Sequence, residues 1–417
     1  MDDARRAVEA VWRIESAKLI AALTRMVGDV GAAEDLAQDA LVAALERWPE
    51  IGVPSNPGAW LMATAKHRAV DLMRRNTLHE RKSDAIAREI TEQSDAATPD
   101  LDAAMDDEIG DDLLRLMFMC CHPVLATEAR VALTLRLLGG LTTPEIARAF
   151  LVPEATLAQR IVRAKRTLTE ARVPFDIPRG AELRARLSSV LEVLYLVFNE
   201  GYSATAGDDW VRPALCEDAM RLGRVLEQLA PDEPEVHGLV ALMELQASRL
   251  RARVAADGTP ILLMDQDRMR WDRLLITHGL GALDRAMPPR APLGPYALQA
   301  AIAACHARAA TPRDTDWERI AALYDALAQV TPSPIVELNR AVAVGMAFGP
   351  AAGLEIIDAI AQDRALAKYH LLPAVRGDLL ERLGRRDEAR REFERAASLA
   401  TNARERTIMQ DRAAAAQ

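Results

Sequence analysis

Residues 141–168 read LTTPEIARAFLVPEATLAQRIVRAKRTL, and their pattern predicts the local fold. A pair of threonines followed by Pro144 can cap and begin a helix, and Pro153 then breaks that helix. A second helix begins at Glu154. Small and apolar residues stand where they can lock two helices at a steep angle, namely Ile146, Ala147, Leu157 and Ile161. The stretch therefore predicts a helix-turn-helix.

The second helix of this motif carries side chains suited to duplex DNA. In the major groove, arginine can pair with guanine and glutamine with adenine. Six basic and three acidic residues give residues 141–172 a net charge of +3, whereas the whole chain has −9. We expect base contacts from Thr156, Gln159, Arg160 and Arg163, and phosphate contacts from Lys165, Arg166 and Arg172. The alternative is an ordinary helical hairpin with a solvated basic face.

The composition predicts an all-α fold. Half of the 417 residues are hydrophobic and only 4% are aromatic, and alanine, leucine and arginine dominate. Runs of β-branched residues with alternating polarity are scarce. The start of the chain lacks the pattern of a secretory signal, and no apolar run reaches the length of a membrane span. With four cysteines, a cytoplasmic protein with reduced thiols and no membrane contact is the simplest expectation.

Changes in composition divide the chain into four parts. Residues 8–78 predict a small bundle of amphipathic helices, and residues 79–112 are an acidic, polar linker. Residues 113–173 are compact and helical and contain the helix-turn-helix, and residues 180–417 alternate helices with proline and glycine. Within the helix expected at 32–48, the apolar residues predicted to face inward are Leu36, Ala40, Val42, Ala43 and Leu45.

A repeated spacing runs through the last part. Small or apolar residues and a proline stand at offsets 0, 4, 7 and 12 from Ala219 and again from Ile320. The pattern returns without the proline from Ala352 and from Ala389. It resembles the tetratricopeptide repeat, in which helix pairs stack into an array. The alternative is a generic helical bundle in an alanine-rich chain.

The chain also resembles a known family. Residues 8–172 resemble the two-domain bacterial sigma factors of the extracytoplasmic-function type, and residues 180–417 resemble the tetratricopeptide-like extension of one branch of that family. The first resemblance rests on residues 33–41 (AEDLAQDAL), 60–65 (WLMATA) and 69–75 (AVDLMRR), and on the helix-turn-helix. The second rests on residues 118–123 (FMCCHP), 198–202 (FNEGY), 265–268 (DQDR) and 270–272 (RWD).

The resemblance implies roles for residues in the first half. The helix with Asp35, Gln38 and Leu41 would dock on the coiled coil of the core RNA polymerase clamp. The helix-turn-helix would read the −35 promoter element. The family usually has asparagine at the position of His67. The −10 strand would be held by Trp60, Lys66, His67, Arg68, Arg74 and Arg75.

The implied function is promoter-specific initiation of transcription by an alternative sigma factor, with a fused C-terminal regulatory domain. That domain would either inhibit the factor or be required for its activity, and its repeats could hold a protein or peptide. No catalytic residue and no cofactor is expected. The alternative function is a DNA-binding regulator with a peptide-binding repeat domain that acts without core polymerase.

Three further clusters of polar or reactive residues are candidates for a binding site. Cys120, Cys121 and His122 suggest a metal site, but adjacent cysteines on a helix point about 100° apart, so buried thiols are favoured and no metal is expected. Gly201 is expected to cap the helix before it, with Tyr202 folded back, although a ligand contact is an alternative. The charged patch between Asp265 and Arg273 is expected to form salt bridges along a helix.

Overall fold

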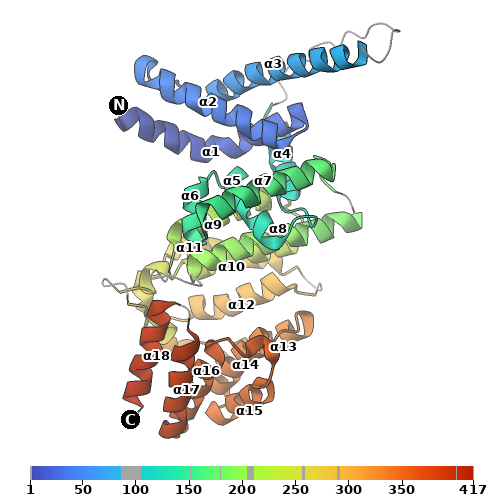
Figure 1. Ribbon diagram of the computed structural model, residues 1–417. Coiled ribbons are helices and arrows are strands. Elements are labelled where there is room, and N and C mark those ends of the chain that lie inside the picture. Colours follow the sequence, from blue (N-terminus) through green and yellow to red (C-terminus); the bar gives the residue numbers. More distant parts are fainter. Residues whose placement is uncertain are drawn as a thin grey trace. The chain divides into compact units, whose positions relative to one another are not determined.

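The computed structural model describes residues 2–85, 105–150, 152–178, 180–203, 211–255, 259–288, 292–400 and 402–416. Within these ranges the chain forms α-helices and short 3-10 turns and contains no β-strand. The predicted all-α fold is confirmed. The chain divides into two compact units, residues 1–194 and 195–417 (Figure 1). No helix among the described residues is both long and apolar enough to cross a bilayer.

The first unit contains the helix-turn-helix and the helices that precede it. Its helix α2 begins where the Asp29 carboxylate accepts a hydrogen bond from the backbone N–H of Ala32 at 2.8 Å, which is an N-terminal cap. It ends at Gly52, whose φ of 83° suits glycine. The helices are α1 (Asp2–Val27), α2 (Val30–Ile51), α3 (Pro57–Ala85), α4 (Met105–Cys120), α5 (Thr127–Leu137), α6 (Thr143–Ala149), α7 (Glu154–Glu170) and α8 (Gly180–Tyr202).

Both ends of the acidic segment 79–112 are helical. Helix α3 continues to Ala85 and α4 already begins at Met105, and residues 86–104 lie outside the described part. Asp112 is only 1% exposed. Its carboxylate pairs with Arg25 on α1 at 3.0 Å and with Arg115 at 2.7 Å. The end of the acidic segment therefore anchors α4 to α1.

The inward face of α2 differs from the expectation at two residues. Leu36, Ala40 and Ala43 are buried as predicted, but Val42 is 50% exposed and Leu45 is 37% exposed. A helix turns by about 100° per residue, so Val42 lies on the side opposite Ala40. The first unit thus presents two apolar side chains of α2 to solvent.

In the second unit, from α12 onward, each helix packs against the next one along the chain (Figure 1). This is the stacked arrangement of helices that the repeated spacing predicts. The helices of the unit after α8 are α9 (Pro213–Leu229), α10 (Pro234–Ala247), α11 (Arg273–Ala286), α12 (Pro295–Arg308), α13 (Trp317–Val330), α14 (Pro334–Ala347), α15 (Pro350–Ile360), α16 (Leu371–Arg382), α17 (Arg386–Leu399) and α18 (Ala403–Ala415).

One pair shows why the spacing uses small residues. A Cβ atom on Gly377 of α16 would lie 2.7 Å from the Phe393 ring of α17. Phe393 and Ala389 are fully buried. The missing side chain at Gly377 therefore makes room for the phenyl ring, and the two helices pack closely.

The boundary between the two compact units falls inside α8. The guanidinium of Arg186 donates to the carbonyl of Phe118 at 3.0 Å, and the Ser189 hydroxyl donates to the carbonyl of Cys121 at 2.6 Å. These bonds satisfy carbonyls at the end of α4. The first turns of α8 are thus part of the first unit.

Candidate nucleic-acid and polymerase interface

The first helix of the helix-turn-helix is fixed by a capping box. The backbone N–H and the hydroxyl of Thr142 both donate to the Glu145 carboxylate at 2.7 Å. The N–H of Glu145 donates back to the Thr142 hydroxyl at 3.4 Å. Such reciprocal bonds define where a helix begins. Ile146 in the next position is fully buried, so α6 is held at both its start and its inner face.

The second helix, α7, divides into a buried and an exposed face. Leu157, Ile161, Ala164 and Leu168 are buried. Arg160 is half-buried and Arg163 is exposed, and neither forms an ion pair with any described residue. The predicted DNA-contacting side chains that are exposed are Thr156, Gln159, Arg163, Arg166 and, just after α7, Arg172.

Two of the three side chains predicted for phosphates already have partners, and the third, Arg172, is exposed. Arg166 pairs with Glu170 one turn along α7, at 2.6 Å. Lys165 pairs with Glu34 of α2. Glu34 is 2% exposed and also accepts a hydrogen bond from Arg136 of α5 at 2.6 Å. Phosphate contacts from Lys165 would require it to leave Glu34.

The electrostatics of Glu34 favour its charged form. Burial alone would raise the pKa of this carboxyl, but the charges of Lys165 and Arg136 outweigh burial, and the pKa is lowered. The amide of Gln38 donates to the same carboxylate at 2.7 Å. At the start of α2, the Thr169 hydroxyl of α7 donates to the capping residue Asp29 at 2.8 Å. Helix α2 is thus tied to α5 and α7 through a buried carboxylate and a capping carboxylate.

Helix α2 places the three residues implied for polymerase docking along its outer side. Asp35 is exposed, and Gln38 and Leu41 are half-buried. The exposed Val42 and Leu45 continue the same surface by helical spacing. Sequence reasoning missed these two residues, although a projection at 100° per residue would have found them. Apolar side chains beside acidic ones suit a protein partner.

Helix α3 carries the residues implied for the −10 strand. The ring of Trp60 meets the edge of the buried Trp48 at 5.5 Å between centroids, which fixes the start of α3. His67 and Arg74 follow Trp60 at intervals of seven residues, so all three share one side of the helix. Arg68 pairs instead with Asp39 of α2 at 3.2 Å.

The sequence predicted two further residues of α3 for this strand, Lys66 and Arg75. Lys66 is half-buried. The side chain of Arg75 lies outside the described part of the chain. The exposed candidates on α3 are therefore His67 and Arg74.

Comparison with known proteins identifies these two helical parts. Residues 14–78 match sigma-70 region 2, and residues 115–168 match sigma-70 region 4. The probable extracytoplasmic-function sigma factor SigI of Mycobacterium tuberculosis is 32% identical over 171 residues, which is 41% of this chain and 57% of SigI. SigC of the same species is 29% identical over 153 residues, which is 36% of this chain and 76% of SigC. The chain belongs to the extracytoplasmic-function sigma factors of the sigma-70 family.

This sigma factor also has a third region that matches a family model. Residues 186–287 match a family of unknown function (DUF6596). An uncharacterized protein of Rhizobium meliloti (strain 1021) is 45% identical over 385 residues, which is 92% of this chain and 90% of that protein. The chain is an alternative sigma factor that directs transcription, and the family implies core RNA polymerase and promoter DNA as its partners. Sigma factors are not enzymes.

The cysteine pair of the sigma factor is part of its core. Cys120 and Cys121 are buried, which confirms the preferred interpretation. Burial raises the pKa of Cys121 to about 11, and its sulfur lies 3.4 Å from the Thr134 hydroxyl. A thiol in this setting is protonated and unreactive at neutral pH. No group of three histidine, cysteine or acidic residues in the described ranges could hold a metal ion.

Two expectations for the extension of the sigma factor are wrong. Gly201 does not cap α8, because the helix continues to Tyr202. A Cβ atom on Gly201 would lie 2.7 Å from the backbone nitrogen of Cys216, so this glycine allows α9 to approach. The charged patch does not form salt bridges along a helix, because Asp267 caps the 3-10 turn Arg268–Arg270 and Asp272 caps α11 instead.

Proposed function

We propose that α7 of this sigma factor reads the −35 element in the major groove. The observation that carries this assignment is the division of α7 into an apolar buried face and an exposed face with Gln159 and Arg163. Both side chains can make paired hydrogen bonds to base edges. Arg160 lies at the border of the same face, and Thr156 at its N-terminal end.

The outer side of α2 is the proposed docking surface for core polymerase. Asp35 supplies a charge for a basic partner, and Val42 and Leu45 supply apolar area. Gln38 and Leu41 lie at the border of this surface. The resemblance to the family assigns the partner as the coiled coil of the polymerase clamp.

Helix α3 is the proposed support for the −10 strand. Trp60 offers an aromatic ring, and His67 and Arg74 lie along the same side of the helix. Lys66 and Arg75 are proposed as further phosphate contacts, and Arg68 joins them when it releases Asp39. In domain terms, residues 8–78 would form region 2, residues 113–173 region 4 and residues 180–417 a regulatory extension.

The arrangement of the first unit is proposed to be a closed, resting form. Lys165 is paired with the buried Glu34 rather than free for DNA, and Gln38 is bonded to the same carboxylate. Binding of polymerase at Gln38 would compete with that hydrogen bond. Separation of α2 from α7 would then free Lys165 for a phosphate. Because its partners are polymerase and DNA, we expect the protein to act in the cytoplasm.

Hydroxyl-radical footprinting of the polymerase complex tests the assignment. The full chain is assembled with core polymerase on a promoter that it transcribes, and the protected bases are mapped for wild type and for Arg163→Ala. We expect protection around −35 that the variant weakens, while protection around −10 persists. Equal protection at −35 in both proteins would remove Arg163 from the interface. Arg184→Ala, an exposed arginine of α8, is the matched control.

A further inference from the structure

Two sequence motifs of the extension meet at one cluster of arginines and aromatic rings. The guanidinium of Arg249 lies 5.8 Å from the ring centroid of Tyr202 and 5.8 Å from that of Trp271. Arg253 stacks on Tyr202 at 3.7 Å, and Arg268 lies 4.9 Å from Trp271. Trp271 is 3% exposed. Residues 198–202 and 265–272, far apart in the sequence, thus build one cationic and aromatic core.

The two aspartates beside these arginines bind backbone N–H groups and form no ion pair with the arginines. Asp267 accepts a hydrogen bond from the N–H of Met269 at 2.9 Å, and Asp272 accepts from the N–H of Leu274 at 3.0 Å. Both are helix caps. The buried Arg268 donates to the carbonyls of His306 at 2.6 Å and Ala309 at 2.7 Å.

The pKa of Arg268 reflects this accumulation of positive charge. Burial, and then the charge of Arg249, lower it from the ordinary value. In the ranges that the structure describes, no carboxylate pairs with Arg249, Arg251 or Arg268, nor with Arg270 or Arg273. The region from Arg249 to Arg273 therefore holds an excess of positive charge, although the whole chain has a net charge of −9.

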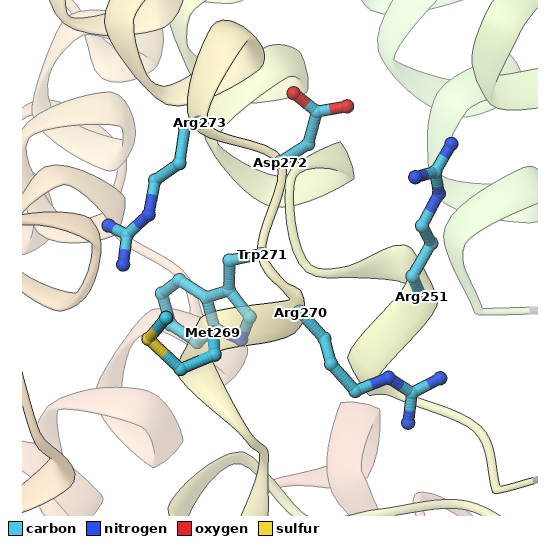
Figure 2. A pocket seen from close by; sticks show the side chains of 6 residues that line it. All are labelled: Arg251, Met269, Arg270, Trp271, Asp272 and Arg273. Carbon is cyan, nitrogen blue, oxygen red and sulfur yellow. The ribbon is translucent and has the colours of Figure 1, made fainter.

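An open pocket of about 580 Å³ lies on the outer side of Trp271 (Figure 2). Figure 2 shows the side chains of Arg251, Arg270 and Arg273 around the turn that carries Trp271. Met269, which also lines the pocket, is 83% exposed, and Leu274, next to Arg273 in the chain, is 82% exposed. The surface combines unpaired arginines with solvent-exposed apolar side chains around a concave site.

We propose that this pocket binds an acidic segment of a partner protein that also carries a large apolar side chain. Arginine binds carboxylates through paired, charge-assisted hydrogen bonds, so Arg251, Arg270 and Arg273 can each take an aspartate or glutamate. Methionine adapts to apolar side chains of varied shape, which suits Met269 to the apolar anchor. A carboxylate in the pocket also offsets the charge of the half-buried Arg249 and the buried Arg268.

Duplex DNA fits these observations less well than an acidic peptide. A DNA backbone is tracked by a row of cations, and it gains nothing from exposed methionine or leucine. Here the three exposed arginines gather around a pocket, and Met269 lies among them. The site is outside the helices proposed for promoter contacts, so its occupancy can be measured without polymerase.

Selection of random peptides displayed on phage, with the full chain as bait, tests this proposal. We expect the selected peptides to be enriched in aspartate and glutamate together with leucine or phenylalanine. A labelled copy of one selected peptide is then titrated by fluorescence anisotropy. The combined change Arg251→Gln, Arg270→Gln and Arg273→Gln should weaken its binding by roughly tenfold or more, because charge-assisted bonds are lost. Met269→Ser should weaken it by several-fold.

The control replaces three other exposed arginines of the same unit, Arg313, Arg364 and Arg391, by glutamine. It changes the net charge equally and should leave binding unaltered. Selected peptides without acidic residues, or equal losses in the two triple variants, would overturn the proposal. So would a duplex oligonucleotide that binds the same three arginines more tightly than the peptide, since that result assigns the site to nucleic acid. The thermal unfolding of each variant shows that it is folded.

Discussion

Glu34 of α2 and Arg136 of α5 are joined by a hydrogen bond of 2.6 Å between the guanidinium Nε and a carboxylate that is 2% exposed. Lys165 of α7 pairs with the other oxygen of the same carboxylate. One buried charge on region 2 therefore faces two cations on region 4. A buried carboxylate with two cationic partners holds its surroundings together only while all three stay in place.

Glu34→Gln should open the first unit and strengthen DNA binding. The neutral amide leaves Arg136 and Lys165 without a counter-charge, and the loss of charge assistance costs about 1–3 kcal/mol. Freed Lys165 can then reach a phosphate. We expect tighter binding of a −35 duplex by the full chain, measured by fluorescence anisotropy. Glu46→Gln, an exposed residue of α2, is the control. Unchanged binding by the Glu34 variant would argue against a closed resting form.

Acidic pH should break the contact of Glu34 with Arg136 and Lys165. The pKa of Glu34 in the closed form is lowered from the ordinary 4.5, so the pairing contributes fully above pH 4.5 and is lost as the pH falls through the lowered value. Energy transfer between dyes on Glu50→Cys and Ala171→Cys, both exposed, should therefore fall below pH 4.5. The native cysteines are buried and should not react. In Glu34→Gln the transfer should be low at every pH. A pH response that persists in that variant would assign the change to another group.

Arg163→Ala should weaken binding to the cognate promoter by about 1–3 kcal/mol, as expected for one lost base contact. Arg163 is exposed on α7 and has no ion-pair partner among the described residues, so its removal should leave the fold unaltered. The difference should shrink on a promoter whose −35 base at that contact is changed. A uniform loss on all sequences would instead indicate a phosphate contact.

Gly201→Ala should destabilise the second unit. The new Cβ would lie 2.7 Å from the Cys216 nitrogen and 2.9 Å from its sulfur, and overpacking of this kind costs about 1–3 kcal/mol. Gly281→Ala is the matched control, because the nearest atom to its Cβ is the end of Arg285 at 3.9 Å. That change should be neutral or stabilise by up to about 1 kcal/mol, since alanine favours helix. Thermal unfolding of both variants gives the comparison. Equal melting temperatures would contradict the close approach of α9.

The helix-turn-helix could be predicted because its determinants are local. The capping pair Thr142 and Glu145 and the break at Pro153 lie within one short stretch, and apolar spacing alone selects the buried face of α7. The same is true of the repeats, where Gly377 and Phe393 lie on neighbouring helices. Helix caps and apolar spacing of this kind can be predicted from the sequence without knowledge of tertiary contacts.

The remaining features depend on partners distant in the sequence. Lys165 looks like a phosphate contact until the fold brings Glu34 to it, and Gly201 looks like a helix cap until α9 packs against it. The aspartates at 265–272 were expected to form salt bridges with the neighbouring arginines. Asp267 and Asp272 instead accept hydrogen bonds from backbone N–H groups. Val42 is a different case, because helical geometry alone places it outside and only its apolar character suggested burial.

Run-off transcription with core RNA polymerase tests most directly whether this chain selects promoters as a sigma factor. The full chain and core polymerase are incubated with fragments of genomic DNA, and the 5′ ends of the transcripts are mapped by sequencing. We expect defined start sites that need this chain, share a −35 and a −10 sequence, and are lost in Asp35→Arg but retained in Glu46→Arg. Transcripts that do not depend on the added chain, or equal transcription by both variants, would contradict it.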